Sequence, residues 1–278
     1  MRPSTTKLFL ALLLLTACAR PSGAPAPTSL ASTAAIAPLP PTTAPTATPT
    51  HQAPPVPPTT LPQPSAAQPV TITAPDGAAL AALYYPPIVK PAPAVLLLHM
   101  LGGSKSDWDS FAKDLQKQGY AVVALDLRGH GQSAGPADWA KAPDDVRAAW
   151  KALIKNPDVD PDRAGIVGAS IGANLALMVG ATEPQAKTVV ALSPGMEYHG
   201  LSPAASMSSF GERPVYLVAS SEDTYPYTSI DSLAKLAIGA VKLQLANAGH
   251  GTAMFKDATL ETKLIEWLNE DVRDAKKG

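Results

Sequence analysis

From Val70 onward, the chain alternates short apolar runs with amphipathic segments. The runs are AVLLLHM (94–100), AVVALDL (121–127), AGIVGAS (164–170), KTVVALS (187–193), PVYLVAS (214–220) and VKLQLAN (241–247). All of the runs predict strands, and the first two, which have no polar face, predict strands covered on both sides of a sheet. Segments with helical spacing lie between or after them, at 106–119, 144–155, 171–181, 229–237 and 259–272. This alternation predicts an α/β domain with a mostly parallel central sheet and helices on both faces.

The start of this domain has a different pattern. VTIT (70–73) and AALAALYY (78–85) are separated by APDG (74–77). Because Pro, Asp and Gly favour a tight turn, we expect these two segments to pair as antiparallel strands.

The residues before the domain cannot build a core. No Asp, Glu, Lys or Arg occurs between Arg20 and Asp76, and fifteen of the 30 prolines lie between Pro21 and Pro69. With so few large apolar side chains, burial cannot offset the entropy of ordering the chain. We therefore expect residues 18–69 to be a disordered Pro/Thr/Ala-rich linker and residues 70–278 to form one domain.

The N-terminus has the features of an export signal. Arg2 and Lys7 precede the apolar run LFLALLLL (8–15), which is too short for a stable membrane span. We expect residues 1–17 to be a signal peptide. The end of this segment, LTAC (15–18), resembles a bacterial lipobox, which implies lipid attachment at Cys18 and an extracytoplasmic location on a bacterial membrane. An ordinary signal peptide with a coincidental cysteine is the alternative.

The charge of the domain excludes a nucleic-acid partner. All 23 acidic residues and 19 of the 22 basic ones lie after residue 69, which gives a net charge of −4. A nucleic-acid-binding domain would carry a basic patch instead. The five histidines are too scattered for metal-ligand spacing, and there is no dinucleotide fingerprint. We therefore expect no metal and no cofactor.

A serine, an aspartate and a histidine, the residue types of a nucleophilic catalytic triad, each follow a predicted strand. Ser170 lies in a G-x-S-x-G pattern between a strand and a helix, Asp223 follows the strand at 214–220, and His250 follows the last strand. The carboxyl ends of parallel strands share one edge of a sheet, so these side chains are expected to meet there.

The order Ser170, Asp223, His250 resembles that of the α/β-hydrolase superfamily. DLRGHGQS (126–133) also resembles a turn common in that family, and the size resembles the dienelactone-hydrolase-like and small esterase groups. The resemblance covers nearly all of residues 70–277. It implies the α/β-hydrolase fold, and only about twenty residues (194–213) are available for a lid, so a minimal lid is expected.

The resemblance also implies roles for these residues. Ser170 would be the nucleophile, His250 its base and Asp223 the residue that orients His250. The backbone N–H groups of Ile171 and Leu101 would form the oxyanion hole. Glu222 is an alternative to Asp223, and His130 an alternative base.

Several further residues are candidates for the pocket wall: His99, Met100, Trp108, Met196, Tyr198, His199 and Tyr225. Each is also compatible with plain packing or, for His199, with solvent exposure. Met100 follows His99 where many relatives have glycine, which leaves the oxyanion donor on that loop open.

These observations predict an extracytoplasmic, membrane-anchored serine hydrolase, foremost a carboxylesterase acting on a small-molecule ester through an acyl-enzyme. A peptidase, thioesterase or acyltransferase on the same triad is the alternative, because fold alone does not set the substrate. A non-catalytic surface binding module is a further alternative.

Overall fold

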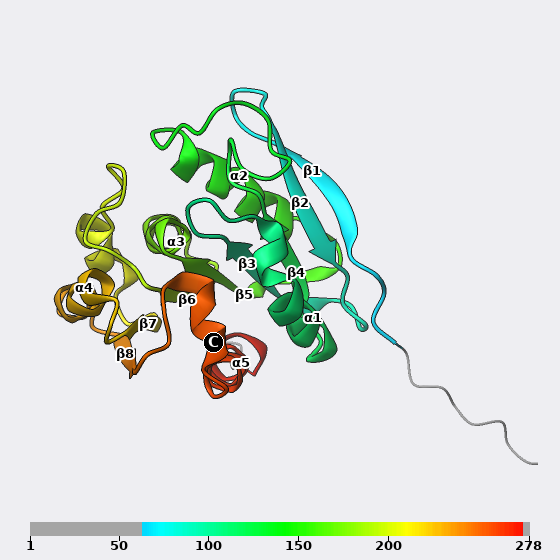
Figure 1. Cartoon of the computed structure of the whole chain (residues 1–278). Coiled ribbons are helices and arrows are strands. Elements are labelled where there is room, and N and C mark those ends of the chain that lie inside the picture. The colour runs from blue at the N-terminus through cyan, green and yellow to red at the C-terminus, as the bar shows by residue number, and fades with distance from the viewer. Residues whose placement is uncertain (1–62, 275–278) are drawn as a thin grey trace, which may run out of the picture. The chain divides into compact units, whose positions relative to one another are not determined.

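Eight strands form one sheet in the order β1-β2-β4-β3-β5-β6-β7-β8 (Figure 1). The computed structural model describes residues 63–274, all within one compact unit of residues 58–278. The strands are β1 (Gln68–Thr73), β2 (Ala79–Tyr85), β3 (Ala92–Leu98), β4 (Ala121–Leu125), β5 (Val159–Ala169), β6 (Ala186–Leu192), β7 (Val215–Ser220) and β8 (Ala240–Leu245). The predicted signal peptide, Cys18 and most of the predicted linker lie outside the described residues.

The sheet is mostly parallel, as predicted. β1 pairs antiparallel with β2, and β2 pairs antiparallel with β4, whereas every pair from β4 to β8 is parallel. The predicted fold class is therefore confirmed, including the antiparallel pair at the start of the domain.

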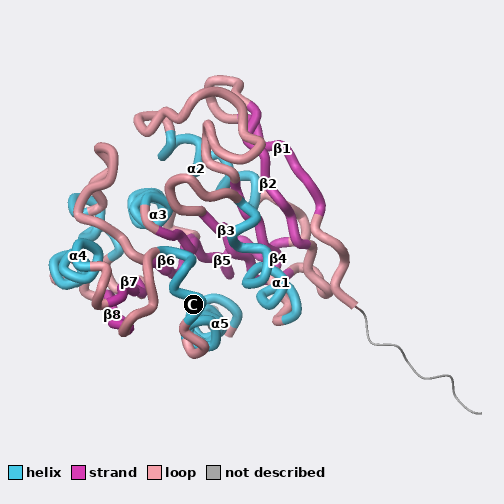
Figure 2. Tube along the Cα trace, in the orientation of Figure 1, coloured by secondary structure: helices cyan, strands magenta, loops and turns pink. Residues whose placement is uncertain are grey.

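Helices cover both faces of the sheet (Figures 1 and 2). Side chains of α2 (Ala142–Ile154), α3 (Ile171–Thr182) and α4 (Thr224–Ala234) belong to one apolar core. Those of α1 (Asp109–Lys117) and α5 (Leu260–Leu268) belong to a second core. Strand β3 supplies both, because successive side chains of a strand point to opposite faces: Leu96 and Leu98 enter the first core, and Val95 and Leu97 the second.

The helices differ in detail from the prediction. α4 begins at Thr224 rather than near residue 229, because Pro226 is accommodated in the first turn, where its missing N–H costs nothing. The segment predicted as one helix over 259–272 is α5 followed by a π-helical turn at Asn269–Arg273. The segment predicted at 106–119 begins with a 3-10 turn, Lys105–Trp108. A capping box formed by Ser104 and Asp107 stabilises the start of this turn.

Two short elements complete the described chain, and no lid domain is present in it. Residues 193–214 connect β6 to β7 and contain only the 3-10 helix Ala204–Phe210. A second 3-10 helix, Gly251–Lys256, follows β8. The predicted minimal lid is thus confirmed. None of the helices within residues 63–274 combines the length and the apolar character that crossing a bilayer requires.

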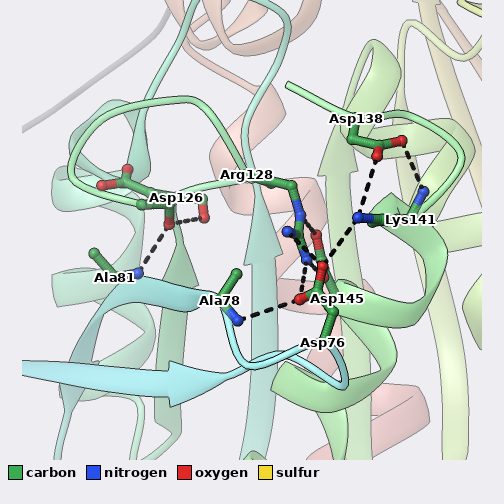
Figure 3. A network of polar contacts seen from close by, with 9 residues as sticks. Asp76, Ala78, Ala81, Asp126, Arg128, Asp138, Lys141 and Asp145 are labelled. Carbon is green, nitrogen blue, oxygen red and sulfur yellow. Dashed lines mark hydrogen bonds and ion pairs between the residues drawn. The ribbon is translucent and has the colours of Figure 1, made fainter. Parts of the chain in front are cut away.

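The turn after β4 is held by a buried arginine (Figure 3). Arg128 donates from Nε and Nη2 to the Asp145 carboxylate of α2, at 2.7 and 2.6 Å. It also donates from Nη1 and Nη2 to the Asp76 carboxylate, both at 2.9 Å. Lys141 adds an ion pair to Asp76 at 3.1 Å. These contacts join the β1–β2 turn, the β4 loop and α2 into one unit.

Asp126, in the same turn, is fully buried. Its carboxylate accepts hydrogen bonds from the backbone N–H groups of Lys105 and Gln132, at 2.7 and 2.8 Å, and pairs with the Lys105 ammonium group. The pair ties the loop after β3 to the loop after β4.

Candidate active site

Ser170 occupies a sharp turn between β5 and α3. Its backbone has φ 53° and ψ −118°, a left-handed conformation that non-glycine residues seldom adopt. The Ser170 N–H donates to the Leu192 carbonyl of β6 at 2.7 Å, and the Ser170 carbonyl accepts from Ala173 at the start of α3. Strain of this kind persists only where the surroundings enforce it, and it concentrates at functional sites.

The two glycines of the G-x-S-x-G pattern are required by close backbone contacts. A Cβ atom on Gly168 would lie 2.1 Å from the Gly172 carbonyl oxygen. A Cβ atom on Gly172 would lie 2.5 Å from the carbonyl oxygens of Leu98 and His99. Any side chain at either position would push α3 away from β3 and β5. The pattern is therefore a packing condition for the Ser170 turn.

A histidine–carboxylate pair lies at the same edge of the sheet. His250 Nδ1 lies 2.6 Å from Asp223 Oδ2. Asp223 follows β7 and is the N-cap residue of α4, and His250 follows β8. The His250 side chain is 41% exposed and that of Asp223 only 19% exposed. The carboxylate thus orients the imidazole ring through Nδ1, while the His250 side chain remains partly exposed.

Ser170 and His250 line one small pocket of about 180 Å³. Its other lining residues are Met100, Leu101, Ile171, Tyr198 and His199. The structure therefore brings together the predicted nucleophile, the predicted base, both predicted oxyanion residues and three of the predicted wall residues.

Glu222, the alternative to Asp223, has a different partner. Its carboxylate accepts from the Ser220 hydroxyl and from the Gly249 N–H, and these hydrogen bonds lower its pKa to about 2. It therefore holds the loop that precedes His250, and the contact to the imidazole itself comes from Asp223.

His99 lies beneath the pocket with a fixed tautomer. Its Nε2 accepts from the Leu127 N–H at 2.9 Å, so the ring proton is on Nδ1, which donates to the Met100 carbonyl at 2.7 Å. Burial lowers the pKa of His99, which keeps the ring neutral. His99 is thus a backbone-bonding residue below the pocket rather than part of its lining.

This anchoring orients the peptide between Met100 and Leu101. The Met100 carbonyl accepts from His99 and from the Gly103 N–H at 2.9 Å. In a planar trans peptide the N–H points away from the carbonyl, so the Leu101 N–H is directed to the opposite side. Ile171 opens α3, and the first N–H groups of a helix have no partner within the helix. Both residues that carry these backbone donors line the small pocket.

Tyr198 lines the small pocket together with Ser170, and its hydroxyl donates to the Ser193 carbonyl at 3.3 Å. Burial raises the pKa of Tyr198, and the charge of Asp223 adds to this effect. The phenol therefore keeps its proton. The Tyr225 ring packs edge-on against Tyr198 with centroids 5.7 Å apart.

The remaining predicted wall residues lie elsewhere. Trp108 is fully buried in the core beneath α1, Met196 packs against the opposite core, and Tyr225 supports Tyr198 from outside the small pocket. His130 contacts the Arg128 carbonyl at 3.0 Å and does not line that pocket.

Three supporting residues escaped the sequence interpretation. The buried Asn174 amide bridges the Gly195 N–H and the Leu201 carbonyl, which holds the segment that carries Tyr198. Ser193 Oγ accepts from the Gly251 N–H at 3.0 Å, and Ser220 Oγ accepts from the Ala248 N–H at 2.8 Å. All three are polar residues in otherwise apolar runs, a signal that marks a buried hydrogen bond without naming its partner.

Within residues 63–274, no group of three or more His, Cys, Asp or Glu side chains is arranged to hold a metal ion.

Comparison with known proteins agrees with the fold. Residues 93–250 match the alpha/beta hydrolase fold family. The putative hydrolase YtaP of Bacillus subtilis is 28% identical over 170 residues, which cover 51% of this chain and 56% of YtaP. The chain matches only about half the length of the first such curated relatives.

Solved structures extend the agreement to the whole described domain. Est1E from Butyrivibrio proteoclasticus, with ferulic acid bound, superimposes with a TM-score of 0.64 at 19% identity, covering 73% of this chain and 98% of Est1E. Dienelactone hydrolase from Anabaena variabilis gives a TM-score of 0.61 at 18% identity, covering 75% and 97%. At such identities these likenesses concern the fold. Together with the family match, they show that this chain belongs to the alpha/beta hydrolase fold family.

Proposed function

We propose that this chain is a serine carboxylesterase that acts through Ser170, His250 and Asp223. The observation that carries the proposal is the shared pocket, in which Ser170 on its strained turn faces a histidine held by Asp223 at 2.6 Å. A serine hydroxyl needs such a base to become a nucleophile at neutral pH.

The reaction follows from these positions. His250 takes the Ser170 proton as the oxygen attacks the ester carbonyl, and Asp223 stabilises the imidazolium that forms. The N–H groups of Ile171 and Leu101 receive the oxyanion, each contributing about 3 kcal/mol to the barrier. The imidazolium then gives its proton to the departing alcohol, and water releases the acid from Ser170 in a second, equivalent step.

Exposure of the site favours hydrolysis over acyl transfer. The His250 side chain is 41% exposed, and residues 193–214 form no lid domain over it. Water can therefore reach an acyl-enzyme, whereas an acyltransferase has to exclude it. Thioester and peptide hydrolysis use the same groups, so they are the alternatives that a substrate panel has to separate.

The test is labelling by a fluorophosphonate, which reacts with an activated serine. We expect the native domain to be labelled and the Ser170→Ala variant not to be. Absence of label on both proteins would contradict the proposal. A panel of p-nitrophenyl esters, matched thioesters and peptide amides would then rank the bond types, and turnover of amides alone would replace esterase by peptidase.

We further propose that the protein is tethered outside the cytoplasm through a lipid on Cys18. The support is the sequence alone: a basic start, a short apolar run and the LTAC segment that ends at Cys18. The intact mass of the protein from its native membrane should show a chain that begins at an acylated Cys18. A mature chain with an unmodified Cys18, or with its start elsewhere, would contradict the anchor.

A further inference from the structure

A larger pocket adjoins the catalytic one. It measures about 590 Å³ and lies between the loop after β3, the start of α1 and the chain that follows His250. Met100 and Leu101 line both pockets. The two spaces are therefore neighbours across the loop that carries the proposed Leu101 oxyanion donor.

The position of His250 indicates which part of an ester this larger pocket would hold, the leaving group or the acyl group. In the proposed mechanism the imidazolium gives its proton to the departing oxygen, so the leaving group lies beside His250. His250 itself lines the smaller pocket, and Thr252 and Ala253, which follow it after Gly251, line the larger one. Tyr198 and His199 line only the smaller pocket. The larger pocket is thus on the leaving-group side, and the smaller one is left for the acyl group.

The inner wall of the pocket is aromatic. Phe111 and Phe255 line it, with ring centroids 5.2 Å apart, and the buried Trp108 ring packs edge-on against Phe255 at 5.9 Å. Such a wall favours a flat or ring-shaped apolar group.

The charged side chains of the lining have one sign. Asp107 and Glu261 contribute carboxylates, and the lining holds no Lys or Arg. The polar neighbours are the side chains of Ser110 and Thr252.

We propose that this larger pocket is the leaving-group subsite of the enzyme, and that it takes a bulky, ring-containing alcohol that is neutral or cationic. The inference rests on the proposed esterase function. The smaller pocket, of about 180 Å³, is left for the acyl group.

Met100 lies between the two pockets and lines both. A Cβ atom on Gly251 would lie 2.9 Å from Met100 Sδ, and Thr252 Oγ1 lies 3.9 Å from the same sulfur. The thioether is therefore wedged against the loop of His250. Since a methionine side chain is flexible, it can move aside for a substrate that spans both pockets.

The test fills the pocket without touching the proposed catalytic groups. Ser110 is exposed on α1 and lines the pocket, whereas Ser232 is exposed on α4 away from it. Ser110→Trp is the test variant and Ser232→Trp the control. Three esters are compared: ethyl acetate, 2-(1-naphthyl)ethyl acetate with a bulky alcohol of similar reactivity, and ethyl 1-naphthylacetate with the bulk on the acyl side.

We expect the wild type to prefer the naphthylethyl ester over ethyl acetate in kcat/KM by about tenfold or more, the usual value of well-placed apolar contacts. Ser110→Trp should lower kcat/KM for that ester by about tenfold and change ethyl acetate by no more than about twofold, while Ser232→Trp changes neither. Melting temperatures and fluorophosphonate titration show whether Ser110→Trp is folded; if it is not, Ser110→Leu replaces it with the same expectation.

A second arm tests charge. The wild type should hydrolyse a carboxylate-bearing analogue of the naphthylethyl ester about tenfold less efficiently than the neutral ester, and Glu261→Gln should reduce this difference to about threefold or less, because like charges near a partly buried site repel. An equal rate for both esters in the wild type would overturn the charge assignment.

The outcomes separate the two proposals. If the wild type hydrolyses none of the esters and takes no fluorophosphonate, the esterase proposal fails, and the subsite fails with it. If it hydrolyses esters but Ser110→Trp leaves the naphthylethyl ester unchanged, or impairs ethyl 1-naphthylacetate instead, only the leaving-group assignment fails.

Discussion

Two polar clusters lie beyond the carboxyl ends of the strands, and they are built in opposite ways. Around Arg128, three nitrogens of one guanidinium group make four hydrogen bonds to the carboxylates of Asp76 and Asp145. The Arg128 side chain is only 7% exposed. Around Ser170, the His250 ring is held at one nitrogen by Asp223, and its side chain is 41% exposed beside the pocket.

The difference separates stability from chemistry. A buried charge that is paired with two carboxylates is committed to holding the fold, and removal of one partner leaves an uncompensated charge. A histidine fixed at one nitrogen and accessible at the other can exchange a proton with a substrate. The Arg128 cluster is therefore expected to govern folding, and the Ser170 cluster to govern turnover.

The largest effect should come from Ser170→Ala. Loss of the nucleophile is expected to lower kcat by about 10⁶-fold, while the free energy of unfolding changes by less than about 1 kcal/mol. Ester hydrolysis and urea denaturation of the same preparation measure the two quantities. A variant that loses stability in proportion to activity would contradict the separation.

The next effect should come from Asp223→Asn. The amide cannot hold the imidazole in the same tautomer, so kcat is expected to fall by about 10⁴-fold. Glu222→Gln is the matched control, because it keeps an acceptor for the Gly249 N–H, and we expect a loss of no more than about tenfold. If the two variants reversed this order, Glu222 rather than Asp223 would be the residue that orients His250.

The Arg128 cluster is tested by Asp145→Ala. Its side chain is 2% exposed, and its loss leaves Arg128 with one carboxylate partner in a buried site. The expected cost is about 3–5 kcal/mol in the free energy of unfolding. Because the site residues are untouched, kcat per active site should stay within about threefold. Asp144→Ala, whose side chain is 65% exposed, should cost no more than about 1 kcal/mol.

The smallest effect is expected in the stability of the protein at acidic pH. Hydrogen bonds from Arg128, and then from the Ala78 N–H, hold the pKa of Asp76 far below its usual value. A carboxylate with a depressed folded-state pKa stabilises the protein above its unfolded pKa of about 4, and this contribution is lost as the pH falls further. The melting temperature of the wild type should therefore exceed that of Asp76→Asn by a constant margin when both are measured between about pH 5 and 8. The margin should shrink below about pH 4. A margin that grew in acid would contradict the assigned direction.

Local patterns were sufficient for the elements and for their order. The apolar runs became strands, of which β3 and β4 are buried throughout and β8 is buried only at Leu245. The alternation with amphipathic segments became a mostly parallel sheet. Periodicity reports what a segment buries, so it predicts element type well and boundaries less well. Pro226 illustrates the limit, because a proline in the first turn of α4 reads in sequence as a break before the helix.

The candidate catalytic residues were predictable because each has a reactive side chain and follows a strand in the chain. Ser170, Asp223 and His250 each follow a strand, and parallel strands deliver their carboxyl ends to one edge. The wall of the pocket was not predictable in the same way. Tyr198 lines it and Trp108 does not, because these positions depend on how loops from different strands pack.

The sequence by itself determined the fold class, the glycines that the Ser170 turn requires and the three residues that share its edge of the sheet, because these depend on local conformation and on the order of strands. Only the tertiary structure decided that Asp223 rather than Glu222 contacts His250, that His99 anchors the Met100 carbonyl, and that a second pocket opens beyond Met100. Such contacts join loops far apart in the chain. Their distances follow from strand register and loop packing, which no local pattern records.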